Sequence, residues 1–502
     1  MGWSERLWGK NAKLTYLLLA ALLVLLTCLG TRDIWTQEHR WADIVYAMFY
    51  NHDFLHPSLN GNDYYDKPLL SYWFIAGFAI LMGKLSTWAM RLPSALAGVL
   101  AVWSIYRLGT RLKDRQLGLL SGWILLTTFY FIFWARTSSA DMLNMAGTLF
   151  AVTWYFERKS HPNFFTYAVF FLILAVTALC KGLVGPVVTV LAILPDLFMR
   201  QEWKRHLRLS LIAGLIPAAI LYALPFWAST HFGVAHYQEN GLYLVYRENI
   251  LRYFQPFDHK GPIYTYFLFL PVYLLPWTLF FIPALFAVKS RWKTMSDSSK
   301  WVVMAVVVLF AFFTLSGSRR SYYILPLVPF AILLTADWIL AGVESAKRDR
   351  WSGRLAVLFF GGLFLNFVVI QPIYYGQSGV PAFAEELKHQ AEITKPWADW
   401  NVVMLDPESK LRFYLDLSPV APLHNLDGSS RYQQTAETLL HVWPMLKNPD
   451  PSTIYVSRKA YEPILKSVLK DYTVIEANAG LGQRLFKKKN ADLPIAFIPK
   501  TS

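Results

Sequence analysis

Residues 62–82 read NDYYDKPLLSYWFIAGFAILM, and the way this stretch meets the membrane decides the fold of the chain. Its apolar part, 69–82, looks long enough to cross a bilayer. Each crossing moves the next loop to the other side of the membrane, so a span here would invert every later loop. The charges of those loops therefore indicate whether residues 69–82 cross.

Five short segments between apolar runs carry most of the positive charge near the membrane. Short loops rich in Lys and Arg stay in the cytoplasm, because their transfer across the bilayer is disfavoured. All five are cytoplasmic if the N-terminus is inside and residues 69–82 dip into the outer leaflet without crossing, and we adopt this topology. The segments are Arg107, Arg111, Lys113 and Arg115; Arg158 and Lys159; Arg200, Lys204, Arg205 and Arg208; Lys289, Arg291, Lys293 and Lys300; and Lys347, Arg348, Arg350 and Arg354, to which the N-terminus adds Arg6, Lys10 and Lys13.

The composition excludes several classes of protein. Of 502 residues, 55% are hydrophobic and only 16% are charged, which is typical of a polytopic membrane protein. The net charge of +15 comes largely from the cytoplasmic loops and a basic C-terminal tail. It indicates contact with anionic lipids or lipid phosphates and not with nucleic acid. Both cysteines, Cys28 and Cys180, lie in apolar runs, which argues against a disulfide framework.

We predict a polytopic α-helical membrane domain over residues 1–374, with about 11 to 13 transmembrane helices. The first apolar segment, 14–30, follows basic residues and resembles an uncleaved signal anchor. A long outer loop, 31–91, contains an amphipathic helix after Glu38 that is expected to lie at the membrane interface. The predicted spans are roughly 14–30, 92–107, 117–135, 142–157, 164–179, 183–199, 209–227, 263–288, 301–316, 321–341 and 355–374.

Residues 375–502 change in character, because apolar runs shorten and charge rises. We predict a small soluble α/β domain on the outer, periplasmic face. Its expected strands are 401–405, 453–456, 473–476 and 482–487, with a helix at 462–469. No catalytic motif is visible in this part, so the chemistry is expected in the outer loops of the membrane domain.

The acidic candidates open these outer loops. Glu38 follows the first span almost at once, where a carboxylate suits acid–base work or the orientation of a hydroxyl. The alternative is an N-terminal helix acid that the helix dipole favours. Asp141 flanks the mouth of a span near Arg136, and these two residues could equally form an ordinary ion pair.

Asp66 and Lys67 lie where the chain enters the lipid, a place where charge is costly without a partner such as a metal, a phosphate or a counter-charge. An interfacial salt bridge is the alternative. His259, in the fourth outer loop, makes a divalent metal site with Asp66 conceivable, although a lone histidine is more often structural.

Lys181 is the single charge in a tight outer turn, and Arg319 and Arg320 lie in another. Both turns break the positive-inside pattern. A cation held at the outer headgroup level suits a lipid-linked phosphate, which arginine can bind in bidentate fashion. Snorkelling of these side chains to the interface is the alternative.

Seven short motifs, in order over about residues 14–340, resemble those of the GT-C glycosyltransferases of the protein O-mannosyltransferase and lipid A aminoarabinose transferase type. They are Trp-x-x-Glu-x-Arg (35–40); Tyr-x-Asp-Lys-Pro-Leu-Leu-x-Tyr-Trp (64–73); Arg-Leu-Pro-Ser (91–94); Ala135-Arg136 followed by Asp141; Lys181-Gly182; His-x-Gly-Pro (259–262); and the Ser-x-Ser-Arg…Tyr-x-Leu-Pro-Leu-x-Pro run that ends at Pro329.

This resemblance implies an inverting glycosyltransferase that takes a sugar from a polyprenyl (undecaprenyl) phosphate donor and passes it to an acceptor on the outer face of the bacterial inner membrane. It implies Glu38 and Asp141 as catalytic residues. Asp66 and His259 would hold a divalent metal ion. The donor phosphate would be bound by Arg40, Lys67, Lys181, Arg319 and Arg320.

The chain departs from the family at Gln37, where the family has an aspartate. An amide cannot accept a proton at neutral pH, so Glu38 or Asp141 would have to act as the general base. A phosphate acceptor would need no base, which favours lipid A or another cell-envelope glycolipid as the acceptor. Transfer to exported proteins is the alternative within the class.

Two other classes are weighed against an enzyme. A transporter or flippase for a lipid-linked sugar should show charges near the bilayer midplane and repeat symmetry, whereas the charges here cluster at the outer edge and no repeat is found. A non-enzymatic assembly factor would leave the charges of the outer loops unexplained.

Overall fold

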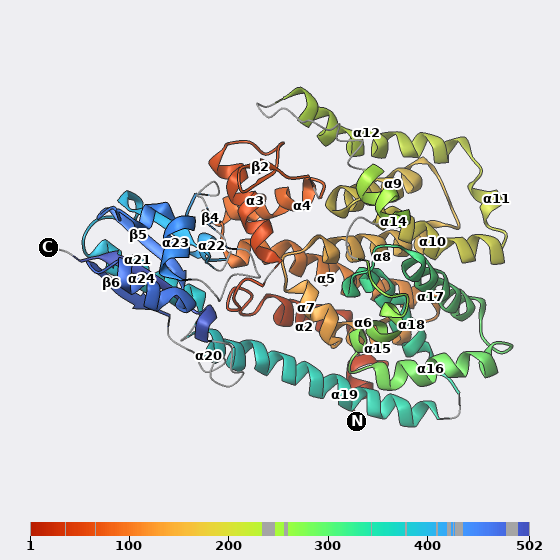
Figure 1. Cartoon of the computed structure of the whole chain (residues 1–502). Coiled ribbons are helices and arrows are strands. Elements are labelled where there is room, and N and C mark those ends of the chain that lie inside the picture. Colours follow the sequence, from red (N-terminus) through yellow and green to blue (C-terminus); the bar gives the residue numbers. More distant parts are fainter. Residues whose placement is uncertain are drawn as a thin grey trace. The chain divides into compact units, whose positions relative to one another are not determined.

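Helices make up most of the computed structural model, and the chain divides into two units (Figure 1). Unit 1 comprises Met1–Leu29, Phe54–His56 and Tyr64–Leu365, and unit 2 comprises Gly30–Asp53, Pro57–Asp63 and Asn366–Ser502. The structure describes residues 2–35, 37–65, 67–232, 246–255, 260–342, 344–376, 379–407, 410–418, 423–424, 426, 435–477 and 490–500.

The elements of unit 1 are α1 (Trp3–Trp8), α2 (Leu14–Leu26), α4 (Leu70–Leu81), α5 (Thr87–Leu112), α6 (Arg115–Leu126), α7 (Phe129–Ala135), α8 (Ala140–Arg158), α9 (Phe164–Lys181), α10 (Val184–Met199), α11 (Trp203–His206), α12 (Leu209–His231), η1 (Arg247–Leu251), α14 (Arg252–Phe254), α15 (Thr265–Tyr273), α16 (Thr278–Arg291), α17 (Asp297–Leu315), η2 (Ser321–Leu327), α18 (Val328–Ile339) and α19 (Ser345–Leu365). Those of unit 2 are α3 (Glu38–Tyr50), β1 (Ser58–Leu59), β2 (Asn62–Asp63), η3 (Asn366–Ile370), α20 (Gln371–Gly376), α21 (Val380–Glu392), η4 (Trp397–Asp399), β3 (Asn401–Leu405), α22 (Leu411–Tyr414), β4 (Leu423–His424), α23 (Ala436–Val442), η5 (Pro444–Leu446), β5 (Thr453–Arg458), η6 (Lys459–Tyr461), α24 (Glu462–Val468), β6 (Tyr472–Glu476), η7 (Asn490–Asp492) and β7 (Pro494–Pro499).

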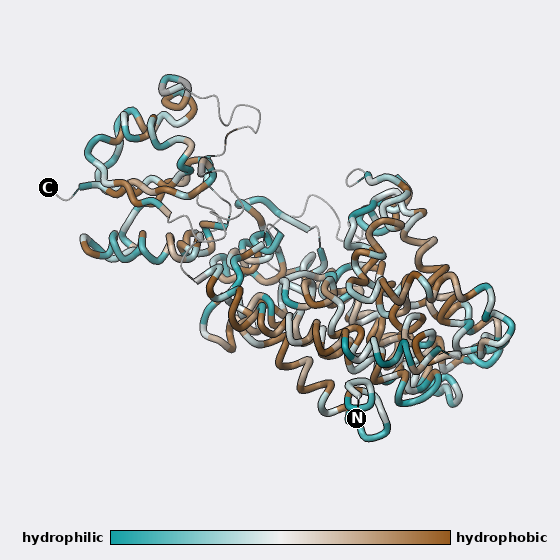
Figure 2. The backbone as a smooth tube through the Cα atoms, turned by 90° about the horizontal axis from the view of Figure 1, so that it is seen from below, coloured by the Kyte–Doolittle hydropathy of each residue, from teal (hydrophilic) through white to brown (hydrophobic). Residues whose placement is uncertain are grey.

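Unit 1 is a bundle of apolar helices, as the hydropathy pattern predicts (Figure 2). Within the described residues, six helices are long and apolar enough to cross a membrane, or seven if the bent pair α6–α7 counts as one span. Three more apolar helices, α2, α4 and α10, are shorter. The prediction of a multi-pass α-helical membrane protein is therefore confirmed, while the predicted number of spans stays a prediction.

Two of the predicted spans are interrupted. The span predicted at 117–135 consists of α6 and α7, which are bent by 70°. At the break, the hydroxyls of Thr127 and Thr128 donate to carbonyls of the preceding turn at 2.6 and 2.7 Å and compete with the helical ladder. The span predicted at 263–288 consists of α15 and α16, with a turn between them. Hydropathy alone could not locate either interruption, because the apolar composition continues through both.

The basic clusters are joined to one another and to the N-terminal segment at one end of unit 1. The contacts are Arg115 Nη2 to the carbonyl of Ala12 (2.5 Å), Trp8 Nε1 to Asp349 (2.7 Å), Arg107 Nε to Glu157 (2.7 Å), Lys159 Nζ to Asp196 (2.5 Å), Arg200 Nε to Asp196 (3.3 Å), Arg200 Nη2 to Ser298 (3.4 Å), and Lys113 and Arg291 to Asp337 (3.4 and 3.2 Å). The prediction that these segments share one side of the membrane is consistent with this network.

The contact between Arg115 and Ala12 also bears on residues 69–82. Because the two residues meet, the chain between them crosses the membrane an even number of times. If α2 and α5 both cross, α4 does not. Helices α4 and α2 are both short: α4 spans about 18 Å and α2, with 13 residues, about 20 Å, each less than the ~30 Å hydrocarbon core. That residues 69–82 dip into the bilayer without crossing it therefore stays a prediction.

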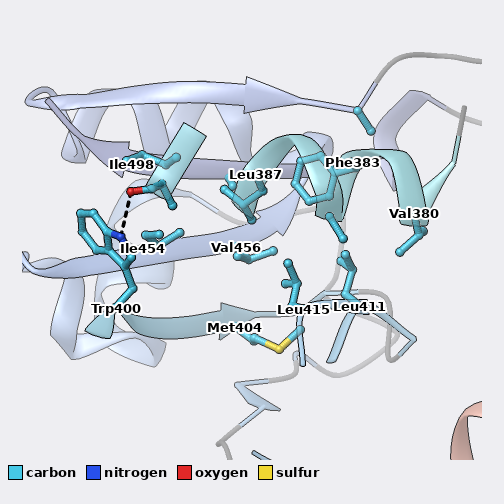
Figure 3. Packing of buried hydrophobic residues seen from close by; sticks show 14 residues of the cluster. Val380, Phe383, Leu387, Trp400, Met404, Leu411, Leu415, Ile454, Val456 and Ile498 are labelled. Atoms are coloured by element: carbon cyan, nitrogen blue, oxygen red, sulfur yellow. Dashed lines mark hydrogen bonds between the residues drawn. The ribbon is translucent and has the colours of Figure 1, made fainter. Parts of the chain in front are cut away.

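Unit 2 contains a five-stranded sheet in the order β4-β3-β5-β7-β6. Strand β3 pairs in parallel with β4 and β5, whereas β7 pairs antiparallel with β5 and β6. Successive side chains of β5 alternate between the two faces, as the pleat requires. Ile454 and Val456 pack with α21 and α22 on one face (Figure 3), and Tyr455 packs with α23 and α24 on the other.

The sequence located most of this domain. The strands predicted at 401–405, 453–456 and 473–476 are β3, β5 and β6, and the predicted helix is α24. The strand predicted at 482–487 lies outside the described residues. Strand β7, which lies between β5 and β6, was missed because Pro494 and Pro499 flank it, and proline usually argues against a strand inside a sheet.

The predicted amphipathic helix is α3, but it groups with unit 2 and not with the membrane helices. Ile44, Val45 and Met48 of its apolar face are buried in protein. The helix packs against β1 and α22. Residues 30–53 and 57–63 of the long outer loop therefore belong with the C-terminal part of the chain, whereas the predicted domain boundary placed the whole loop with residues 1–374.

The topology predicts opposite labelling of two exposed positions, Lys84 after α4 and Gln116 at the start of α6. In a background without Cys28 and Cys180, we expect an impermeant thiol reagent added to intact cells to label Lys84→Cys and not Gln116→Cys. If α4 crosses the membrane, the reagent labels Gln116→Cys and not Lys84→Cys, and the whole topology is wrong.

Candidate functional site

The candidate site lies at the end of unit 1 opposite the basic clusters. Helix α8 starts at Ala140 and ends in the second basic cluster at Arg158, and α9 runs the other way and ends at Lys181. These two helices pack against each other (Figure 1). The 19 residues of α8 span about 28 Å, close to the thickness of the hydrocarbon core. Asp141 and Lys181 are thus brought together about one bilayer thickness away from the basic end.

Asp141 and Lys181 form an ion pair in which each side chain is 11% exposed. Ser139 caps α8: its Oγ accepts a hydrogen bond from the Asp141 amide at 3.0 Å and donates to Asp141 Oδ2 at 2.7 Å. Lys181 Nζ donates to Oδ1, so both carboxylate oxygens are engaged. In this weakly solvated place neither charge is tolerated without the other. The pair therefore fixes both side chains before any substrate arrives.

Further cations surround this pair. Lys67 and Arg252 lie close enough to Lys181 to interact with it electrostatically, and Lys181 Nζ is 5.1 Å from the centre of the Tyr323 ring. Arg252 Nη1 is held by Glu248 at 2.5 Å. Glu248 is also paired with Arg247 at 3.2 Å, so the cations of this region outnumber the two carboxylates. An anion that enters here gains electrostatic stabilisation from groups that are already oriented.

The turn after α9 is possible only with glycine. Gly182 has φ of +112°, a conformation that L side chains rarely adopt. Its α-carbon also lies against Asn249: an added Cβ would be 2.6 Å from Asn249 Oδ1. That oxygen accepts a hydrogen bond from the Leu183 amide at 2.7 Å. The fourth outer loop therefore clamps the turn that carries Lys181.

Arg319 has a different environment from Lys181. Its Nε donates to the carbonyl of Thr314 at 3.0 Å and its Nη1 to the carbonyl of Gly261 at 2.6 Å. These bonds tie the end of α17 to the segment that follows the fourth outer loop. Arg320 accepts a hydrogen bond from the Tyr266 hydroxyl at its carbonyl, at 3.1 Å. The geometry of Arg319 favours a structural role, and the assignment of both arginines to the donor phosphate stays a prediction.

Two other arginines of the sequence motifs cap the first membrane helix. The guanidinium of Arg136 donates three hydrogen bonds of 2.7 to 3.1 Å to carbonyls within residues 24–28, and Arg91 donates to the carbonyl of Leu29 at 2.9 Å. Cations at the C-terminal end of a helix satisfy its last carbonyls and complement its dipole. Asp141 thus pairs with Lys181 and not with Arg136, the partner considered from the sequence. Arg136 instead stabilises the C-terminal end of α2.

Glu38 lies in unit 2 and is fully buried. Its Oε2 accepts a hydrogen bond from the Trp35 amide at 2.8 Å and lies 3.4 Å from Arg32 Nη2. This is the arrangement of an acid at a helix N-terminus, the alternative considered from the sequence. Glu38 and Arg40 belong to one unit and Asp141 and Lys181 to the other, so a joint catalytic role of Glu38 and Asp141 stays a prediction.

The two predicted metal ligands, Asp66 and His259, lie outside the described residues. Over the remainder of the chain that the structure describes, no three His, Cys, Asp or Glu side chains are grouped so as to hold a metal ion. The metal site therefore stays a prediction.

Sequence reasoning missed Arg252, Asn249 and Tyr323. Arg252 carries the signal that identified Lys181, because it is a cation in an outer loop, although Glu248 lies four residues before it and pairs with it. Tyr323 opens the Tyr-x-Leu-Pro motif, yet nothing in the sequence indicates that its ring faces Lys181. These contacts join segments up to about 140 residues apart, which spacing alone does not reveal.

The chain combines a bundle of apolar helices, a buried Asp141–Lys181 pair at one end of that bundle, and a small α/β unit. The family model for dolichyl-phosphate-mannose-protein mannosyltransferases matches residues 66–228. The chain is therefore a GT-C glycosyltransferase that resembles the protein O-mannosyltransferases and the lipid A aminoarabinose transferases, as its motifs predict.

The chain is similar to particular members of this class. An undecaprenyl phosphate-α-4-amino-4-deoxy-L-arabinose arabinosyl transferase of Shewanella sediminis is 25% identical over 76% of this chain and 69% of its own length. One of Pseudomonas fluorescens is 28% identical over 75% and 68%. The crystal structure of ArnT from Cupriavidus metallidurans bound to undecaprenyl phosphate has the same fold, with a TM-score of 0.71, 17% identity, and coverage of 96% of this chain and 97% of that one.

The turn at Gly182 can be tested by substitution. We expect Gly182→Ala to lower thermal stability and glycosyl transfer together, because the strained backbone costs on the order of 1–3 kcal/mol and the added methyl group displaces Asn249. Gly361→Ala is the matched control, since its Cβ would meet nothing within 4 Å. Wild-type melting and transfer in Gly182→Ala would show that the turn does not fix Lys181.

Proposed function

We propose that this enzyme transfers a sugar from an undecaprenyl-phosphate-linked donor to a cell-envelope acceptor on the periplasmic face of the bacterial inner membrane. The observation that carries the proposal is the Asp141–Lys181 pair, at the end of the bundle opposite the basic clusters and beside Lys67 and Arg252. A lipid-linked phosphate lies at the same depth as these cations, with its prenyl chain among apolar helices.

The chemistry requires a stabilised leaving group. The bond between the anomeric carbon and the phosphate oxygen breaks, and the phosphate departs with the electron pair while the acceptor oxygen attacks from the opposite face. Lys181, with Lys67 and Arg252 close by, would stabilise the charge that grows on the departing phosphate. As Lys181 turns towards that phosphate, the carboxylate of Asp141 becomes able to orient the acceptor or to take its proton.

The acceptor is proposed to be lipid A or another envelope glycolipid. The curated relatives named above are aminoarabinose transferases, and Gln37 cannot serve as a base. A phosphate acceptor is already anionic at neutral pH and needs none. Transfer to exported proteins, which the mannosyltransferase family model suggests, remains the alternative acceptor class.

A divalent ion held by Asp66 and His259 is retained as part of the proposal, on the strength of the residue types and their motifs. It would help to bind the donor phosphate. Transfer at the wild-type rate after chelation would remove the ion from the mechanism.

A lipid-linked sugar transporter is the second candidate class. Along α8, the buried charges Asp141 and Lys159 lie at the two ends of the helix and not at its centre. This placement favours chemistry at one surface over passage through the bilayer. A transporter would move the donor across a vesicle membrane without consuming it.

Donor binding tests the proposal directly. We expect Lys181→Ala to weaken the binding of undecaprenyl phosphate in nanodiscs by roughly ten- to a hundredfold, because a charge-assisted contact contributes about 1.5–3 kcal/mol. Lys84→Ala is the matched control, since Lys84 is an exposed lysine outside the cluster, and its binding should equal that of the wild type.

The variant Asp141→Asn distinguishes donor binding from the glycosyl transfer step. It should retain donor binding, because Lys181 is then freed for the phosphate, while transfer falls by on the order of 10²-fold or more. Unchanged donor binding in Lys181→Ala would make this residue an interfacial anchor and would place the donor site elsewhere.

A further inference from the structure

One short segment of the C-terminal domain contacts the first outer loop on both sides of residues 35–40. This segment, 410–416, contains α22. The stretch 35–40 carries the Trp-x-x-Glu-x-Arg motif. Both lie in unit 2, although about 370 residues separate them in the sequence.

Two contacts hold the chain just before the motif. The amide of Ile34 donates a hydrogen bond to the Tyr414 hydroxyl at 3.0 Å. Lys410 Nζ lies 3.4 Å from Asp33 Oδ2. Because the second contact is an ion pair of partly buried side chains and the first fixes the backbone, the entry to the motif is held in both position and direction.

Three contacts hold the chain after the motif. Arg412 is 2% exposed and interacts electrostatically with Asp43, which is 7% exposed. Its Nη1 also donates to Asn60 Oδ1 at 2.8 Å. The Tyr46 hydroxyl donates to the carbonyl of Asp416 at 3.4 Å. Arg412 thus joins α3, the β1–β2 turn and the C-terminal domain.

One further bond lies within the motif. Glu38, at the start of α3, is buried, and its Oε2 accepts a hydrogen bond from the Trp35 amide at 2.8 Å. A motif that is bonded to the same segment on both sides is held in one geometry. Glycosyl transfer depends on such preorganisation, since small displacements of a functional group lower the rate steeply.

We propose that segment 410–416, through Arg412, positions the stretch 35–40 for glycosyl transfer. The C-terminal domain then contributes to the transfer rate by positioning this loop. Arg412 is a positioning residue, since it acts through Asp43 and Asn60. This inference rests on the proposed function, because the motif matters only if transfer occurs at this loop.

The variant Arg412→Met tests this role with little disturbance of the domain. Burial raises the pKa of Asp43 to about 6 even with Arg412 nearby. Loss of the arginine raises this pKa further, which favours the neutral carboxyl group and lowers the cost of leaving it without its partner. The methionine side chain fills most of the space of the arginine stem, which keeps the domain packed.

The matched control is Arg458→Met. Arg458 is a mostly enclosed arginine of the same domain, 13% exposed, and its ion pairs join it to Asp406 and Asp492 within the C-terminal part. Among the described residues, Arg458 forms no ion pair or hydrogen bond with residues 33–46, so its loss perturbs the domain without releasing the motif.

The experiment measures three quantities on the full-length protein in nanodiscs: amide hydrogen exchange of residues 33–46, the transfer rate, and the affinity for undecaprenyl phosphate. In Arg412→Met we expect exchange at 33–46 to rise and transfer to fall by roughly tenfold or more, with donor affinity within twofold of the wild type. In Arg458→Met exchange at 33–46 and transfer should stay as in the wild type, although the melting temperature falls.

The outcomes are separable. Unchanged exchange at 33–46 in Arg412→Met, or equal losses of transfer in both variants, would overturn the positioning role. If the wild-type protein neither binds the polyprenyl phosphate nor transfers sugar, the proposed function fails, and the exchange data still decide whether Arg412 holds the loop.

Discussion

The candidate site of the membrane unit depends on a buried ion pair, Asp141–Lys181. Charge at this depth is tolerated only when it is paired and hydrogen-bonded, and the surrounding features supply these conditions. Ser139 caps α8 and orients the carboxylate, while Gly182 lets the chain turn directly after the lysine. Asn249 then clamps that turn from the fourth outer loop. A pair held in this way is stable while the site is empty and can exchange one partner for a phosphate when the donor arrives.

The fold was largely predictable because lipid constrains sequence strongly. Apolar runs located the helices, and the positive clusters indicated which helix ends lie together. The contact between Arg115 and Ala12 agrees with the parity argument for residues 69–82. Hydropathy could not predict the bend between α6 and α7, because threonine hydroxyls interrupt the helix without interrupting the apolar run. Nor could it predict that α3 packs on the C-terminal domain, since a helix face buried by protein and one buried by lipid have the same composition.

The site was predictable in its residue types and less so in their roles. Lys181 and Asp141 were identified separately, as a charge that breaks the positive-inside pattern and as a carboxylate at the mouth of a span, and the structure joins them. Arg136 was expected near Asp141 but caps α2, because the end of that helix offers three carbonyls to one guanidinium. Arg252 and Tyr323 contribute through contacts between distant segments, which no local pattern encodes. Motifs that a family shares can thus serve the scaffold as much as the chemistry.

The central claim is that Lys181 and its neighbours receive a polyprenyl phosphate at the outer surface and that Asp141 acts on the acceptor. The most direct measurement is transfer by the purified protein in proteoliposomes that contain an undecaprenyl-phosphate-linked sugar and either lipid A or an exported peptide, with products identified by mass spectrometry. The account predicts a glycosylated lipid product and free undecaprenyl phosphate in equal amounts, both formed on the order of 10²-fold more slowly with Asp141→Asn. Movement of the intact donor across the vesicle membrane without a glycosylated product would contradict it.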